Sequence, residues 1–121
     1  MAHEVKAGSL PGIVIQKILD PYNIKDMTAV ESLGLDKGKR WILLDVSEMS
    51  IGLPENFLEG ARNSYFLHEN MMHMALYTKS DLLATIGRMV AKLTHRQDKL
   101  SVHQSFEAAE THLVALIHKS A

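Results

Sequence analysis

The stretch Trp41-Ile42-Leu43-Leu44-Asp45-Val46 decides the fold of this chain. Five of its six residues are apolar, and the run is too short for most helices. A short apolar run of this kind is typical of a strand that is buried on both faces, as in a parallel sheet. We therefore predict a central strand over 41–46. In such a sheet, function usually lies in the loop after the carboxyl end of a central strand.

The segments on either side alternate between strand and helix patterns. Apolar and β-branched runs predict four further strands, at 3–8, 12–19, 71–78 and 100–103. Asp20 as an N-cap before Pro21 predicts a helix at 20–33, and Pro54 at a first helical position predicts one at 54–68. Ser80 and Ser105 are predicted N-caps, and the helical apolar spacing after each of them predicts helices at 81–93 and 106–117.

Apolar residues at helical spacing predict which helix faces are buried. In the third helix, the predicted core-facing residues are Leu82, Leu83, Ile86, Met89, Val90 and Leu93. In the second helix, they are Phe57, Leu58, Ala61, Tyr65 and His68. In the last helix, they are Ala109, Leu113, Leu116 and Ile117. Gly34 is predicted to end the first helix as a C-cap.

The predicted order of elements is β-β-α-β-α-β-α-β-α. Strands separated by helices imply right-handed crossovers and a mostly parallel sheet, with the first strand as an antiparallel edge. No linker, repeat or low-complexity tract interrupts the order. We therefore predict a single α/β domain over 1–121, with five strands and four helices.

Composition and charge restrict the class of protein. The chain has 121 residues, of which 46% are hydrophobic and 22% charged, as in a globular domain. A formal net charge of −1 gives no general attraction to nucleic acid. The absence of cysteine excludes disulfides and thiolate metal sites. Because no apolar run approaches the ~18 residues that span a bilayer and the first residues lack the layout of a secretory signal, we expect a cytoplasmic protein.

Asp45 admits two interpretations. A carboxylate at the end of a strand can act as an acid or a base, but it often accepts backbone hydrogen bonds where the chain turns. We favour the structural role, because the sequence identifies no partner that would shift the pKa of Asp45. Asp45 with His73 or His103 is the one acid–histidine set that could converge at strand ends.

Seven histidines raise the question of a metal site. They occupy positions 3, 68, 73, 95, 103, 112 and 118. No pair has the four-residue spacing of a zinc-protease helix, and His112 and His118 lie on different sides of the last helix. We therefore expect scattered surface or half-buried histidines and no metal.

The remaining motifs favour a binding module over an enzyme. Gly-x-Ser-x-Gly is absent, and the glycines are too dispersed for a P-loop or a dinucleotide fingerprint. Arg88, Lys92 and Arg96, with Lys99 nearby, form a basic stripe that we expect to be a solvated helix face, with an acidic partner as the alternative. Met71–Met74 could form an adaptable surface, but on a strand we expect them in the core. We expect no cofactor.

The order of elements resembles the STAS / SpoIIAA-like family, which includes the bacterial anti-sigma-factor antagonists. The resemblance covers residues 12–117. It rests most on Leu43-Leu44-Asp45-Val46-Ser47 and on the segment 100–109, where a Ser-x-Glu-Ala-type start leads from the last strand into the terminal helix. It implies a bacterial, non-enzymatic regulatory module that binds another protein and can form a homodimer.

In the antagonists, a partner kinase phosphorylates a serine at the start of the helix after the central strand, within an Asp-Ser-Ser-Gly-like motif. The matching residues here are Leu53-Pro54-Glu55-Asn56, which carry no hydroxyl, so no phosphorylation site is transferred to this chain. We expect the loop before Pro54 to be the partner-binding surface. Its candidate residues are Ser47, Met49, Ser50, Ile51 and Leu53.

A second hypothesis is a carrier or sensor of a small apolar ligand or lipid. STAS-like domains resemble lipid-carrier domains of the CRAL-TRIO type. An interior rich in methionine and leucine could open a pocket for such a ligand.

Overall fold

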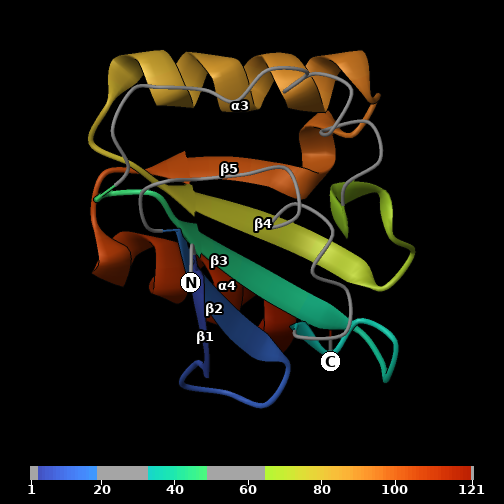
Figure 1. Ribbon diagram of the computed structural model, residues 1–121. Helices are drawn as coiled ribbons and strands as arrows, with labels where there is room; N and C mark the ends of the chain where they lie inside the picture. Colours follow the sequence, from blue (N-terminus) through green and yellow to red (C-terminus); the bar gives the residue numbers. More distant parts are fainter. Residues whose placement is uncertain (1–2, 19–32, 49–64, 121) are drawn as a thin grey trace.

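Five strands form one sheet in the computed structural model, which describes residues 3–18, 33–48 and 65–120 (Figure 1). The strands are β1 (His3–Ala7), β2 (Ile13–Ile18), β3 (Arg40–Asp45), β4 (Met71–Tyr77) and β5 (Leu100–His103), and they lie side by side in sequence order. β1 and β2 are antiparallel, and the other three pairs are parallel. The predicted sheet, with its antiparallel edge strand, is confirmed.

β3 lies in the middle of the sheet and is buried on both of its faces. Ile42 and Leu43 have no exposed surface, although strand geometry points neighbouring side chains in opposite directions. Ile42 packs in a cluster with Leu33, Phe66 and Met74, and Leu43 packs in a different one with Ile15. The short apolar run at 41–46 therefore has the role that the sequence predicts.

Two helices cover opposite faces of the sheet (Figure 1). α3 (Asp81–Leu93) places Leu83 and Ala91 in the clusters on one face. α4 (Phe106–Ser120) places Ala109 and Leu113 in the cluster on the other face. Both helices begin at the predicted caps, since Ser80 Oγ accepts a hydrogen bond from Leu83 N and Ser105 Oγ accepts one from Ala108 N.

The buried face of α3 differs from the predicted one. Leu82, Met89 and Leu93 are 50%, 43% and 52% exposed, so the prediction that they face the core is wrong. The helix instead turns its small residues toward the sheet, at Ala84, Gly87 and Ala91. A Cβ atom at Gly87 would lie 2.8 Å from Leu76 Cδ2, so the small residues allow an approach that leucine and methionine side chains would block.

Of the four predicted helices, the described residues contain two. The predicted helix at 20–33 lies outside them apart from its last residue, and Gly34 has the positive φ of 75° that its predicted C-cap role requires. Most of the predicted helix at 54–68 also lies outside them. Its end is the short 3₁₀ helix η2 (Tyr65–Leu67), and His68 lies in the following turn, where its Nδ1 accepts a hydrogen bond from Asn70 N.

Candidate functional site

The turn after β3 is closed by Asp45 and Ser47. Asp45 Oδ1 accepts hydrogen bonds from the backbone N of Ser47 at 2.9 Å and from its hydroxyl at 2.6 Å. Lys17 Nζ and Glu48 Oε2 form an ion pair of 2.5 Å that links the end of β2 to the same turn. Asp45 therefore has the structural role that we favoured, and the hydroxyl of Ser47 is engaged within its own turn.

The other residues of the predicted partner-binding loop lie outside the described residues. They are Met49, Ser50, Ile51 and Leu53. Ser47 is thus the one member of that set whose environment the structure describes.

The sheet does not place Asp45 beside either candidate histidine. Asp45 is opposite Tyr77 of β4, and Tyr77 is opposite His103 of β5, so a whole strand separates the carboxylate from His103. His73 lies four residues before Tyr77 on β4. The acid–histidine set that the sequence suggested is therefore not assembled around Asp45.

Three histidines gather instead between the sheet and α4. His73 comes from β4, His103 from β5 and His112 from α4. The ring centroid of His112 lies 5.2 Å from that of His73 and 5.0 Å from that of His103. The expectation of scattered histidines is wrong for these three residues, which we call the histidine cluster.

Ser101 of β5 joins two members of the histidine cluster. Its Oγ lies 2.9 Å from Nε2 of His73 and 2.8 Å from Nε2 of His103. Ala75 of β4 is opposite Ser101, and Tyr77 is opposite His103. Alternation along the two strands therefore directs His73, Ser101 and His103 to one face of the sheet.

The direction of these hydrogen bonds can be assigned from the partners of His73. Its imidazole donates to the backbone carbonyl of Asp98, and Nε2 faces Ser101, so the donating nitrogen is Nδ1. In the neutral ring, Nε2 then accepts the hydroxyl proton of Ser101. Ser101 Oγ in turn accepts the Nε2 proton of His103. The result is a directed chain from His103 through Ser101 and His73 to Asp98.

Burial makes this part of the molecule unfavourable for positive charge. His73 is only 8% exposed, and burial is the main reason why its pKa falls from 6.5 to about 4. His112 lowers the pKa of His73 further, as do His103 and Lys99 to a smaller degree, while the Asp98 carbonyl raises it. The pKa of His103 is also lowered, mainly by burial and to a smaller degree by His112.

The histidine cluster does not have the arrangement of a metal site. Within residues 3–18, 33–48 and 65–120, no group of three histidine, aspartate or glutamate side chains could hold a metal ion. A hydroxyl, rather than a shared ion, fills the position between His73 and His103.

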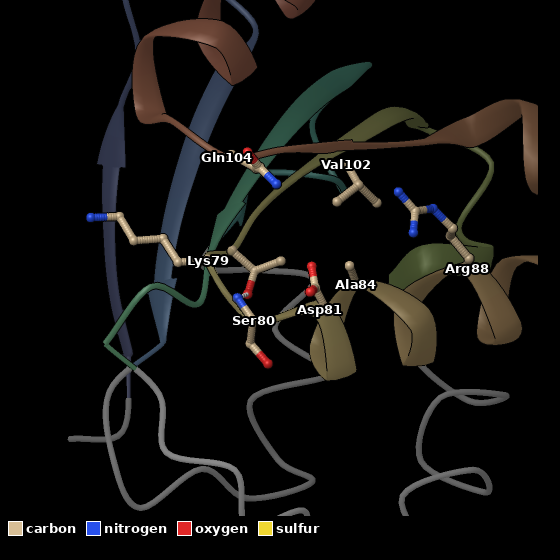
Figure 2. A pocket seen from close by; sticks show the side chains of 8 residues that line it. Lys79, Ser80, Asp81, Ala84, Arg88, Val102 and Gln104 are labelled. Carbon is tan, nitrogen blue, oxygen red and sulfur yellow. Dashed lines mark hydrogen bonds between the residues drawn. The ribbon is translucent and has the colours of Figure 1, made fainter.

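A second candidate site is a cavity of about 220 Å³ between α3 and the carboxyl ends of β4 and β5. Most of its lining is polar, and the lining residues are Thr78, Lys79, Ser80, Asp81, Ala84, Arg88, Val102 and Gln104. Figure 2 shows that Asp81 and Arg88 extend from α3 toward Val102 and Gln104, whereas Lys79 extends outward. Ligands of open α/β sheets usually bind at this end of the strands.

The predicted basic stripe is divided by the structure. Arg88 lines the cavity, and Lys92 is exposed one turn further along α3. Arg96 Nη2 donates a hydrogen bond to the Leu67 carbonyl at 3.2 Å, and Lys99 lies near His73. The stripe is therefore not one uniform solvated face.

Sequence reasoning missed both sites for identifiable reasons. In the sequence, the cavity residues 78–81 have the pattern of a strand end followed by a helix cap, and no motif distinguishes them. The histidine cluster depends on the register between β4 and β5. One signal in the sequence could have indicated part of the cluster: side chains alternate between the two faces of a sheet, so His103 and Ser101, two positions apart on one strand, share a face.

No helix among the described residues has the length and apolar character needed to cross a membrane. Comparisons of the chain with protein-family models, curated proteins and solved structures found no match.

Proposed function

We propose that this protein is a non-enzymatic regulatory module that binds another protein, and that the partner presents an acidic side chain to the cavity between α3 and β5. The bacterial origin, the cytoplasmic location and the homodimer that the sequence resemblance implies stay predictions.

The observation that carries the proposal is the position and chemistry of Arg88. Its guanidinium extends to the cavity from an exposed part of α3, at the carboxyl end of two parallel strands (Figure 2). A guanidinium can bind a carboxylate through two parallel hydrogen bonds. Asp81 also lines the cavity, but no ion pair joins it to Arg88 in the part of the chain that the structure describes, so Arg88 can bind an anionic group of the partner.

The architecture also supports a binding role. The mostly parallel five-stranded sheet with its antiparallel edge strand is the architecture expected from the SpoIIAA-like resemblance. Asp45, the carboxylate at the end of the central strand, closes a turn rather than facing a histidine. The polar lining of the cavity suits a peptide side chain better than a lipid, so it does not favour the apolar-ligand hypothesis.

Immobilised protein tests the proposal through a charge reversal at Arg88. Proteins are captured from a bacterial lysate on the native protein and on the variants Arg88→Glu and Lys92→Glu. Each captured candidate is then purified, and calorimetry measures its affinity for the native protein and for both variants. Lys92 is the matched control, because it is an exposed cation on the same helix that does not line the cavity.

We expect a purified partner to bind the native protein and Lys92→Glu alike, and to bind Arg88→Glu at least about tenfold more weakly. Circular dichroism verifies that both variants fold. Equal affinity of the two variants would show that the partner does not use the cavity. A failure to find any specific partner would count against the binding role itself.

A further inference from the structure

The histidine cluster lies in an interface on which the position of α4 depends. His73 and His103 come from the sheet, and His112 comes from the helix that covers it. His112 precedes Leu113, which is fully buried against the sheet. Any repulsion between the three rings therefore acts directly on the contact between α4 and the strands.

We propose that His73, His103 and His112 form an acid-responsive latch, which holds α4 on the sheet while the three rings are neutral and weakens that contact when they take up protons. This inference is independent of the proposed partner site, which lies at α3 on the opposite face.

Within the neutral hydrogen-bond chain, His73 has no free position for an additional proton. Nε2 of His73 accepts the hydroxyl proton of Ser101 while Nδ1 donates to Asp98. A proton added at Nε2 turns this acceptor into a donor, so the Ser101 hydroxyl loses its acceptor. Ser101 Oγ would then face two donors, the second being Nε2 of His103. Protonation therefore disrupts the chain as well as adding charge.

Charges on the surrounding elements do not neutralise the cluster. On α4, the residues three and four positions from His112 are Ala108, Ala109, Ala115 and Leu116, none of which is ionisable. On the loop before β5, Lys99 adds a positive charge near His73. Asp98 contributes its backbone carbonyl, and its side chain is exposed.

Two carboxylates, one on β3 and one on α4, accept hydrogen bonds from residues outside the histidine cluster. Asp45 of β3 accepts two hydrogen bonds from Ser47, and Glu110 of α4 accepts one from Ser9 N. The neighbour of His73 on β3 is the uncharged Trp41, and that of His103 on β4 is Tyr77. Among the residues that the structure describes, no anion is therefore placed to offset the repulsion that a second proton in the cluster would cause.

Hydrogen exchange of the whole protein tests the latch. Amide protection in α4 is compared with protection in β2 and β3 at pH 7 and pH 4, after correction for the intrinsic pH dependence of exchange. The variants are His112→Gln, which removes the ring contributed by α4, and His118→Gln. His118 is the matched control, because it is an exposed histidine on the same helix and outside the cluster.

For the native protein we expect α4 to lose about tenfold more protection than β2 and β3 on acidification. His118→Gln should behave like the native protein, and His112→Gln should lose most of this selective effect. A uniform loss across the three elements, or an unchanged selective loss in His112→Gln, would overturn the proposal.

An NMR titration of the native protein supplies a second measurement if His112→Gln does not fold. We expect the ring signals of His73 and His103 to titrate as a coupled set, with the pKa of each ring below the ordinary histidine value and His73 neutral at pH 5. Independent titrations of these two rings near the ordinary histidine pKa would refute the latch.

Discussion

Replacement of His73 by glutamine should remove a large part of the acid sensitivity of this fold. Because the pKa of His73 is about 4 in the folded protein and the ordinary histidine pKa is 6.5, the unfolded chain binds more protons between these two pH values. The stabilisation is fully present above pH 6.5 and is lost as the pH falls toward 4. Each tenfold change in proton affinity corresponds to about 1.4 kcal/mol, so the loss attributable to His73 is about 3 kcal/mol.

Glutamine is a suitable replacement because its amide can accept from Ser101 and donate to the Asp98 carbonyl without ionising. Urea unfolding, followed by the fluorescence of the single tryptophan, gives the free energy of unfolding of both proteins from pH 7.5 to pH 4.

Over this pH range, we expect the free energy of unfolding to fall by about 3 kcal/mol more in the native protein than in His73→Gln. Both proteins contain the other acid-sensitive groups, so the contributions of those groups cancel when the two losses are subtracted. If the two proteins lose the same amount, the imidazole is not kept neutral by burial and the reasoning fails.

Three further substitutions test the fold. Leu43→Ala should lower the free energy of unfolding by about 2–5 kcal/mol in chemical denaturation, because it leaves a cavity where a fully buried side chain was; a loss below about 1 kcal/mol would contradict that burial. Asp45→Ala should lower the free energy of unfolding by about 1–3 kcal/mol, because Ser47 loses its hydrogen-bond acceptor, and Asp45→Asn should lower it clearly less. Equal losses in the two variants would exclude a role of Asp45 as the acceptor in this turn. Gly34→Ala should lower the melting temperature, since alanine at a φ of 75° costs about 1–2 kcal/mol and its Cβ would approach Arg40, whereas an unchanged value would show that the turn adapts.

The parts of the fold that were predictable depend on local signals. The run at 41–46 is short and apolar enough to specify a buried strand, and Ser80 and Ser105 mark helix starts through hydrogen bonds to residues three positions later. Alternating strand and helix patterns also predict the parallel part of the sheet. These features need no knowledge of distant contacts.

The rotation of α3 was not predictable from hydrophobicity alone. Its large apolar residues suggest one buried stripe, but Ala84 and Ala91 are buried instead, and Gly87 lies close against Leu76. Close packing favours the face that allows the shortest approach, even when its residues are less hydrophobic. The spacing of apolar residues therefore predicts that a helix forms more reliably than it predicts which face of the helix is buried.

The histidine cluster could not be predicted because it combines three elements. His73 and His103 are 30 residues apart in sequence, and their meeting depends on the register of β4 and β5. The third ring depends on the rotation of α4 about its axis. Alternation within a strand gives the face of each residue, but neither the register nor the helix rotation is encoded locally.

Site-specific cross-linking offers the most direct test of the proposed binding role. Because the chain has no cysteine, a single cysteine that carries a photoreactive group can replace Lys79 at the cavity or Lys119 on α4. A purified partner should form an adduct with the protein labelled at position 79 and not with the protein labelled at position 119. An adduct at position 119 alone would contradict the assignment of the partner to the cavity between α3 and β5.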